Sequence, residues 1–454
     1  MEASAQESFG RALGLHREGR LDEAAALYRA LSGTGNPFAV EARINLGAIL
    51  DQGERHEEAL LQYRDALSLR AGDPIALNNR GNTLMKLGRF PEAADSFRQA
   101  LDRAPDCLEA SIGLGTALQR EGDAAGAIAC FRDTLRREPA CAEAHWNLAL
   151  ALLLAGEFRE GWQEYQWRWR RDSFTSPPRG FSQPCWDGSP LAGRRILVHG
   201  EQGLGDTIQF LRYLPLVAAA GGSVLAECQS ASLLPLVQRV PGVGAVFTMG
   251  EPLPPFDLQV PLLSLPYLFG TTLENIPPQL PYLSAPPERI AAWRTRLAGS
   301  DGFKVGIVWG GKPVPDPFRS CTLEALARLG GIPGVILYSL QLGEAAAQAA
   351  APPAGLELVD LTGEISDFGD TAALVSLLDL VISVDTSVAH LAGALGKPVW
   401  VLLPFCPDWR WLLDRDDSPW YPTARLFRQP GIGDWDSVIG QVGHELSLLA
   451  GRSA

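Results

Sequence analysis

The sequence HGEQGLGDTIQF, which covers residues 199–210, has the spacing of a triphosphate-binding loop but carries the opposite charge. Gly200 and Gly205 are separated by four residues, and the next two positions are Asp206 and Thr207. A triphosphate-binding loop has a lysine where this sequence has Asp206, because that lysine contacts the phosphates. A carboxylate would be repelled by the same phosphates. The loop is therefore not a P-loop, and Asp206 needs a different explanation.

A second set of polar residues follows an apolar segment in the C-terminal half. The strand expected at 380–383 leads through Asp385, Thr386 and Ser387 into an expected helix. Small hydroxyl and acidic residues are favoured at helix starts, and the free amides and dipole of the first turn suit a diphosphate. His390, one turn further, can donate a hydrogen bond to the same phosphates or to a sugar. An ordinary helix cap is the competing interpretation, since such starts are common.

Both segments lie in a region where short apolar strands alternate with helical segments, from residue 194 onward. This alternation predicts parallel sheets covered by helices. A proline-rich stretch at 276–287 divides it into two Rossmann-like lobes, residues 194–300 and 301–454, with a ligand cleft expected between the carboxyl ends of their strands. The expected strands are 195–200, 223–228, 243–249, 304–311, 334–340, 379–385 and 398–404, and the expected helices are 205–221, 230–240, 321–329, 370–378 and 386–396. About 260 residues are few for two complete lobes, which leaves room for a first lobe that lacks a strand or a helix.

The first third of the chain repeats with a period of 34 residues. Small and aromatic residues recur in register, at Gly47, Gly81 and Gly115, at Ala59, Ala93 and Ala127, and at Tyr63, Phe97 and Phe131. This pattern resembles the tetratricopeptide repeat, in which each unit is a pair of antiparallel helices. We predict an α-solenoid of about five units over residues 1–172, followed by a linker at 173–193. Its groove is expected to bind a protein segment, and a stabilising cap or a dimerisation surface is the alternative.

Composition limits the classes of partner. The formal net charge is −13 and the pI is near 5.0, which argues against nucleic acid or an anionic membrane as the main partner. The longest apolar stretch, 148–155, is too short to span a bilayer, and the N-terminal sequence lacks a signal-peptide pattern. The seven cysteines include no C-x-x-C pair, and no His/Cys cluster suggests a metal. We therefore expect a reduced, cytoplasmic protein without a metal site.

Two stretches carry a resemblance to a known family. The sequence LTG at 361–363, continued by DTAALVSLLDLVISVDTSVAHLAGALGKPV at 370–399, resembles the donor-binding region of the ADP-heptose:lipopolysaccharide heptosyltransferases, glycosyltransferase family 9. GLGDTIQFLRYLPLV at 203–217 resembles that family's Gly-Asp loop and the helix after it. The whole chain resembles bacterial proteins that join tetratricopeptide repeats to such a domain, an arrangement also similar to the O-GlcNAc transferases. The implied fold is an α-solenoid followed by a GT-B pair of Rossmann-like lobes.

The resemblance implies an inverting glycosyltransferase that uses a nucleotide-sugar donor and no metal or other cofactor. Asp206 matches the family's catalytic base, which takes a proton from the acceptor hydroxyl as that hydroxyl attacks the anomeric carbon. The other implied site residues are the substrate loop Gln202, Gly203, Gly205 and Thr207 on the first lobe, and the donor and phosphate ligands Lys312, Arg319, Asp385, Thr386, Ser387 and His390 on the second. The sequence does not decide between Lys312 and Arg319 as the cation for the diphosphate. The repeats point to a protein or peptide acceptor.

Three alternatives stand beside this interpretation. Asp206 could serve only as a cap of the helix that starts near Thr207. The chain could be a non-catalytic scaffold whose degenerate transferase domain binds a ligand or a protein partner. A dinucleotide-binding dehydrogenase is the weakest, because Gly203 and Gly205 are not followed by the third glycine of that motif, and Ile208 stands there instead.

Tryptophans occur in two further segments. Residues 408–429 are dense in aromatic and charged side chains, so Trp409, Trp411 and Trp420 could stack on a base or sugar with Arg410 or Arg415 near a phosphate. The other interpretation is a packed loop whose acids and arginines pair with each other. The tryptophans at 162, 167 and 169 are expected to pack the last repeat helix against the next domain.

Overall fold

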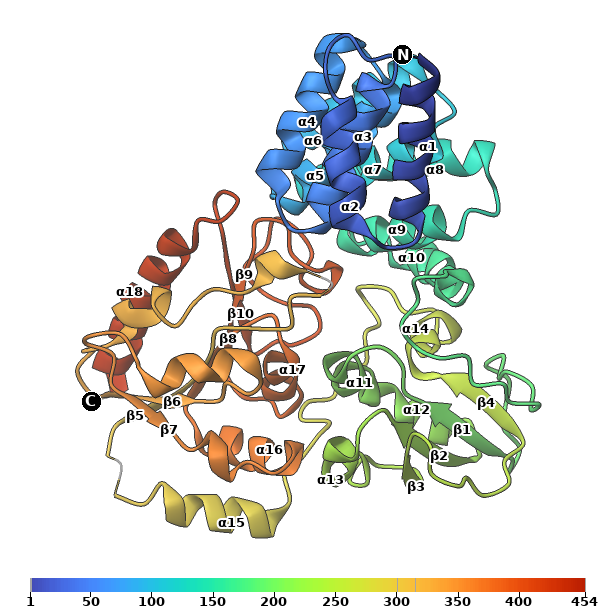
Figure 1. The fold of residues 1–454 in the computed structure, drawn as a ribbon. Helices are drawn as coiled ribbons and strands as arrows, with labels where there is room; N and C mark the ends of the chain where they lie inside the picture. Colours follow the sequence, from blue (N-terminus) through green and yellow to red (C-terminus); the bar gives the residue numbers. More distant parts are fainter. Residues whose placement is uncertain (1, 300, 315, 454) are drawn as a thin grey trace. The chain divides into compact units, whose positions relative to one another are not determined.

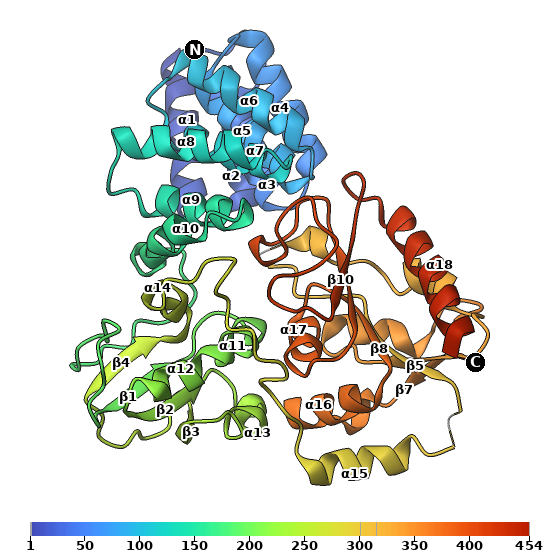
Figure 2. The same cartoon turned by 180° about the vertical axis from the view of Figure 1, so that it is seen from behind.

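The computed structural model describes residues 2–299, 301–314 and 316–453. The chain separates into two compact units, Met1–Ala151 and Leu152–Ala454. Figures 1 and 2 show the helical first unit in blue to cyan and the α/β second unit in green to red. The division between the units falls inside the last predicted repeat, before the predicted boundary at residue 172.

The first unit is an α-solenoid of antiparallel helix pairs, which confirms the fold predicted from the 34-residue period. Its helices are α1 (Glu2–Arg17), α2 (Leu21–Leu31), α3 (Ala39–Gln52), α4 (His56–Leu69), α5 (Pro74–Lys86), α6 (Phe90–Arg103), α7 (Leu108–Arg120) and α8 (Ala124–Arg137). The next helix, α9 (Ala142–Leu154), continues into the second unit. Each pair packs against the one before it, as the contacts of α5 with α4 and of α7 with α6 show.

The recurring glycines and aromatic residues form the contact between the two helices of each pair. A Cβ atom added to Gly81 would lie 2.6 Å from Cε1 of Phe97, and one added to Gly115 would lie 2.5 Å from Cε1 of Phe131. Both rings are fully buried. A glycine is therefore required at each crossing because the ring of the second helix occupies the space of its missing side chain.

We expect Gly81→Ala to destabilise the first unit by up to about 2 kcal/mol. Overpacking against the Phe97 ring costs about 1–3 kcal/mol, and the gain of about 1 kcal/mol in helix propensity offsets part of this cost. Urea unfolding followed by circular dichroism measures the difference. Gly14→Ala in α1 is the matched control, since its added Cβ would have no neighbour within 4 Å and should be neutral or stabilising. If the two substitutions changed the free energy of unfolding equally, the Phe97 ring would not be the reason for a glycine at position 81.

The second unit begins with the end of α9, α10 (Phe158–Glu164) and a 3₁₀ segment, η1 (Tyr165–Arg170), and continues into a small α/β lobe. Its four strands are all parallel in the order β3-β2-β1-β4. They are β1 (Arg195–His199), β2 (Ser223–Cys228), β3 (Val243–Thr248) and β4 (Leu258–Pro261). The helices of this lobe are α11 (Leu204–Phe210), α12 (Leu214–Ala219), α13 (Leu234–Val237) and α14 (Leu265–Leu268).

The second lobe is larger, with six parallel strands in the order β10-β9-β8-β5-β6-β7. The strands are β5 (Phe303–Val308), β6 (Val335–Ser339), β7 (Leu358–Asp360), β8 (Leu380–Val384), β9 (Val399–Leu403) and β10 (Ala424–Arg428). The α-helices are α15 (Pro287–Arg296), α16 (Phe368–Leu377), α17 (Ser387–Ala394) and α18 (Trp435–Ser453). The fold class predicted from the sequence, a solenoid followed by parallel-sheet lobes, is confirmed.

Several predicted elements are wrong in detail. The helix predicted over 205–221 is divided into α11, a 3₁₀ turn at Leu211–Tyr213 and α12, which starts around Pro215. The helix predicted over 230–240 is reduced to a 3₁₀ turn and α13, again with a proline in its first turn. The segment 321–329 contains only the 3₁₀ helix Ala325–Leu329. Prolines start new helical segments because they lack the amide that continues a helix.

Three strands, β4, β7 and β10, were not predicted. β4 has four residues and β7 has three, which is too short for a period-two pattern to be visible. Within the described part of the chain, no helix is both long and apolar enough to cross a membrane.

Candidate functional site

The Gly-Asp loop of the first lobe joins β1 to α11 and is anchored by a buried ion pair. The Glu201 carboxylate has no exposed surface and accepts hydrogen bonds from Nε and Nη2 of Arg168 in η1, at 2.9 and 2.6 Å. It also accepts from the amide of Leu263 at 3.1 Å, while Arg168 donates to the Ser264 hydroxyl at 2.8 Å. Either charge left alone in this position would be strongly destabilising, so the pair holds the loop in one place.

The predicted substrate loop is shaped by contacts within the protein. Gln202 has a φ of 60°, which is uncommon for a residue other than glycine, and its side-chain amide donates to the Tyr165 hydroxyl at 3.0 Å. Thr207 is 1% exposed, and its hydroxyl donates to Gln229 at 2.8 Å. The hydrogen bonds of these two side chains hold the loop in place at both ends, with residues 203–206 between them.

Gly205 lies where the first lobe meets the second. A Cβ atom at this position would be 3.0 Å from Cδ2 of His390 and 3.4 Å from the Cα of Ser387. α11 and the start of α17 are therefore in direct contact. The structure brings together the two segments that the sequence singled out, although they are almost 180 residues apart in the chain.

Asp206 is on the first turn of α11, with both carboxylate oxygens engaged. Oδ2 accepts a hydrogen bond from the Gly203 amide at 2.7 Å, so the helix-cap interpretation is correct for this oxygen. Oδ1 forms an ion pair with Nη2 of Arg410, which comes from the second lobe. Burial raises the pKa of Asp206, and the charge of Arg410 acts in the opposite direction. A raised carboxyl pKa suits a general base that operates near neutral pH.

The start of α17 has unused hydrogen-bond donors. Thr386 is the N-cap residue, but its side chain does not cap the helix and its hydroxyl lies 3.0 Å from that of Ser383. Among the described residues, no acceptor is found for the backbone amides of Ser387 and Val388. Both amides are therefore available to an acceptor at this position, the carboxyl end of β8, where the helix dipole favours a negative charge.

His390 and Asp385 lie buried beside this position. Burial, aided by Arg410, Arg212 and Arg319, lowers the pKa of His390 well below its usual value, so the imidazole is neutral. Its Nδ1 is 3.0 Å from the hydroxyl of Tyr421, and its Nε2 is 3.6 Å from Oδ1 of Asp385, too far for a hydrogen bond. Burial raises the pKa of Asp385 to about 6.

Lys312 and Arg319, the two candidate cations, differ in their surroundings. Lys312 is exposed, and its backbone carbonyl accepts a hydrogen bond from Nη2 of Arg319 at 2.9 Å. Arg319 is half-buried, its Nε is buried with no hydrogen-bond partner among the described residues, and its charge acts on both Asp385 and His390. The guanidinium of Arg319 therefore lies within electrostatic reach of Asp385 and His390 at the α17 start.

The aromatic segment 408–429 is packed into the protein. Trp409, Trp411 and Trp420 are at most 3% exposed, and Trp162 lies against Trp409 with ring centroids 5.1 Å apart. Arg415 pairs with Asp417 at 2.6 Å. The packed-loop interpretation is thus correct for this segment.

Two important side chains near the site are not indicated by the sequence. Arg410, which pairs with Asp206, is expected from the sequence only as a phosphate ligand, and no sequence pattern marks Arg168. Asp206 and Arg410 are 204 positions apart, and Arg168 and Glu201 are 33 apart, so no local spacing could indicate either pair.

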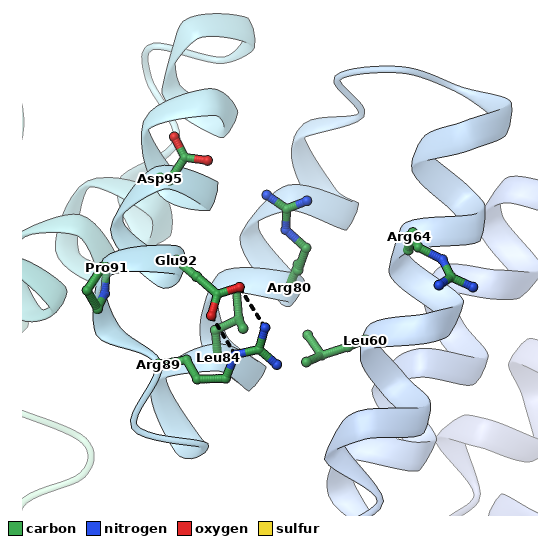
Figure 3. Close-up of a pocket in the computed structure, with 8 residues that line it drawn as sticks. All are labelled: Leu60, Arg64, Arg80, Leu84, Arg89, Pro91, Glu92 and Asp95. Atoms are coloured by element: carbon green, nitrogen blue, oxygen red, sulfur yellow. Dashed lines mark hydrogen bonds and ion pairs between the residues drawn. The ribbon is translucent and has the colours of Figure 1, made fainter. Parts of the chain in front are cut away.

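The first unit contains a separate pocket of about 450 Å³ between α4, α5 and α6. It is lined by Leu60, Arg64, Arg80, Leu84, Arg89, Pro91, Glu92 and Asp95 (Figure 3). Glu92 is held by two hydrogen bonds from Arg89, both 2.6 Å long, and Nε of Arg80 donates to Ser96 at 2.8 Å. The lining has three guanidinium groups and two carboxylates around a small apolar floor.

No group of three or more His, Cys, Asp or Glu side chains in the described ranges is arranged to hold a metal ion. The absence of a metal requirement remains a prediction.

Two family models match different parts of the chain. The tetratricopeptide repeat model matches residues 5–74, 78–129 and 113–166. The model of glycosyltransferase family 9 (heptosyltransferase) matches residues 333–402. That match includes Asp385, Thr386, Ser387 and His390, whereas Asp206, Lys312 and Arg319 lie outside it.

A curated relative extends over nearly the whole chain. Protein FlbA of Caulobacter vibrioides is 28% identical over 465 residues, which cover 95% of this chain and 76% of that protein. Among solved structures, a tetratricopeptide repeat protein from Parabacteroides merdae is 22% identical, with a TM-score of 0.35, and covers 37% of this chain and 68% of its own. Pseudomonas aeruginosa pilF is also 22% identical, with a TM-score of 0.34, and covers 37% of this chain and 75% of its own.

The chain thus carries matches to the tetratricopeptide repeat model in its N-terminal region and to the glycosyltransferase family 9 model in its C-terminal region, and it is similar to Protein FlbA over most of its length. The family 9 match supports a glycosyltransferase type of function.

Proposed function

We propose that the protein is an inverting glycosyltransferase that moves a sugar from a nucleotide-sugar donor to a protein acceptor, without a metal ion. Asp206 accepts the proton of the acceptor hydroxyl while the oxygen of that hydroxyl attacks the anomeric carbon. The bond from this carbon to the donor's diphosphate oxygen breaks, and the diphosphate leaves with the electron pair. A single displacement of this kind inverts the anomeric centre.

The observation that carries this proposal is the contact between the Asp206 loop and the start of α17. A Cβ atom added to Gly205 would lie 3.4 Å from the Cα of Ser387, so the loop that carries Asp206 meets a helix start whose first amides have no acceptor among the described residues. A base for the acceptor and a binding position for the leaving diphosphate are the two groups that glycosyl transfer requires. Their placement on different lobes allows substrate-driven closure to complete the site.

We assign the leaving diphosphate to the amides of Ser387 and Val388, with Arg319 as its cation. The helix dipole contributes about 0.3–1 kcal/mol per charge, and up to ~2 kcal/mol in a partly buried position. Arg319 supplies a full positive charge and a buried Nε that makes no hydrogen bond within the described part of the chain. Neutral His390 is able to donate a hydrogen bond to the phosphates or to the sugar when its proton is on Nε2.

The repeats are proposed to bind the acceptor protein. Stacked helix pairs present an extended surface to a protein segment, and the pocket of Figure 3 adds a small apolar floor with a surplus of guanidinium groups. This lining favours a segment that carries an acidic side chain.

The full-length protein incubated with a panel of nucleotide sugars and a bacterial lysate tests the function. We expect one UDP-, GDP- or ADP-linked sugar to be incorporated into protein, and no incorporation from a CMP-sugar, which has no diphosphate. Tight binding of a nucleoside diphosphate without any transfer would favour the non-catalytic scaffold. Failure to bind any nucleoside diphosphate would overturn the proposal.

Arg319→Gln is expected to weaken nucleoside diphosphate binding about 10- to 100-fold, since a hydrogen bond to a charged group is worth about 1.5–3 kcal/mol. Lys312→Gln is the matched control and should change the affinity less than about fivefold, because a single exposed ionic contact contributes about 1 kcal/mol or less. Isothermal titration calorimetry measures both. The opposite order of effects would assign the diphosphate to Lys312.

A further inference from the structure

Arg410 connects the two lobes at the proposed base. It lies in the short 3₁₀ segment η9 (Trp409–Trp411) of the second lobe, and its side chain is 9% exposed. Nε donates to Oε1 of Gln209 at 2.5 Å, Nη1 donates to Oδ1 of Asp408 at 2.8 Å, and Nη2 pairs with Oδ1 of Asp206. Two of these three acceptors, Gln209 and Asp206, belong to α11 of the first lobe.

The position of Arg410 is fixed by its own loop as well. Asp408 caps η9 by accepting from the Arg410 amide at 3.0 Å, so the same carboxylate holds both the backbone and the guanidinium of this residue. The guanidinium lies over the Trp409 ring, 4.3 Å from its centroid. Trp409 in turn packs against Trp162 and Trp420. Little freedom remains for Arg410 to leave Asp206 while this loop is seated.

The charges around Asp206 explain why it needs this partner. Burial raises the pKa of Asp206, and the nearby carboxylates of Asp408 and Glu201 raise it further. Arg410 is the cation that acts against them, and the Gly203 amide adds a smaller effect in the same direction. The buried Tyr165 hydroxyl also faces Asp206, which contributes to the raised pKa of this tyrosine. Neutral His390 approaches from α17 next to Gly205.

We propose that Arg410 is a positioning residue for the transfer reaction: it holds the Asp206 carboxylate in place and in its charged form, so that the base is complete only while the 408–411 loop of the second lobe is seated on α11. This inference rests on the proposed role of Asp206. Through this contact, Arg410 couples the second lobe, which binds the donor, to Asp206, which activates the acceptor. A base that forms only in the assembled site limits proton removal to the closed enzyme.

The three-way hydrogen bonding requires an arginine. A guanidinium presents five donors in a planar fork, whereas a lysine ammonium is a compact charge on a flexible stem. Arg410→Lys therefore keeps the charge near Asp206 but loses part of the geometry. Arg410→Gln loses both.

The test is the pH profile of kcat for the wild type, Arg410→Gln and Arg410→Lys. In Arg410→Gln, the acid limb should move to higher pH by about one unit or more, because Asp206 without its cation takes up a proton more easily. At neutral pH, kcat should fall at least about tenfold, and more than the affinity for the nucleoside diphosphate falls. Arg410→Lys should keep the acid limb near that of the wild type with a reduced kcat. Arg415→Gln, in the same segment but paired with Asp417, should match the wild type.

An acid limb that stays at the wild-type pH in Arg410→Gln would overturn the proposal, even if kcat falls, because a merely structural role would give that result.

A second measurement does not depend on turnover. The unfolding stabilities of Asp206→Asn, Arg410→Gln and the double variant, compared with the wild type from pH 5 to 8, give the coupling between the two side chains. We expect coupling that disappears on acidification. Its absence at every pH would overturn the role of Arg410, whereas absence of transfer in the wild type would overturn only the proposed function.

Discussion

Asp206→Asn is expected to lower the rate of sugar transfer about 10²- to 10⁴-fold, the usual contribution of a general base. An asparagine keeps the oxygen that caps α11 at the Gly203 amide, but it cannot accept the proton of an acceptor hydroxyl. The affinity for the nucleoside diphosphate should change little, because the proposed phosphate ligands are on the second lobe. Single-turnover kinetics with the donor found in the panel, combined with calorimetry, measures both quantities.

Asp417→Asn is the matched control for this substitution. It makes the same chemical change in an exposed ion pair with Arg415, where Asp417 keeps 64% of its side-chain surface accessible. We expect its transfer rate to equal that of the wild type. If Asp206→Asn also transferred sugar at the wild-type rate, Asp206 would be only a helix cap.

Arg168→Met is expected to destabilise the second unit by about 3–5 kcal/mol. The substitution leaves the Glu201 carboxylate buried and without its cation, and breaking a buried pair on one side costs about this amount. Urea unfolding followed by tryptophan fluorescence reports on this unit, since Trp162 and Trp409 are buried in it. Transfer activity should fall together with stability, because the pair anchors the loop that carries Asp206.

Arg170→Met is the control in the same 3₁₀ segment. Its guanidinium is exposed and lies over the Trp167 ring, 4.3 Å from the centroid, so its loss should cost less than about 1 kcal/mol. In the double variant Arg168→Met/Glu201→Gln, the buried charge is removed, and we expect part of the lost stability to return. An unchanged stability of Arg168→Met would show that the pair does not anchor the loop.

The parts of the fold that the sequence predicted are those with a repeating or periodic signal. Gly81 and Phe97 are one period away from Gly115 and Phe131, and each glycine meets its ring at the same crossing. In the second lobe, β8 and β9 are buried along their whole length and β5 over its last four residues, and their apolar runs are visible in the sequence. Local patterns of this kind determine local structure.

The errors arose where a local signal was weak or misleading. An apolar run through Pro215 was read as one helix because hydrophobic spacing does not show that a proline starts a new segment. The segment 321–329 has helical spacing but forms only a 3₁₀ helix at Ala325–Leu329. β7 has three residues and pairs only with β6, so its position depends on the sheet rather than on its own sequence.

The candidate site shows the same limit. Asp206 and the Asp385–His390 segment could be selected because each follows a strand and begins a helix, a local arrangement. The pairing of Asp206 with Arg410 depends on how two lobes meet, and the pairing of Arg168 with Glu201 depends on how η1 meets the first sheet. Such contacts arise only when distant segments of the chain fold against each other.

The most direct test of the account is a crystal structure of the protein with the nucleoside diphosphate selected by the donor panel. If the first lobe supplies the base and the second lobe binds the diphosphate, the phosphate oxygens must accept hydrogen bonds from the Ser387 and Val388 amides, with Arg319 beside them. It also requires the Asp206 carboxylate to face the side of the bound diphosphate where the sugar and acceptor would meet. A diphosphate bound away from the first turn of α17, or an Asp206 side chain directed away from it, would contradict the central claim.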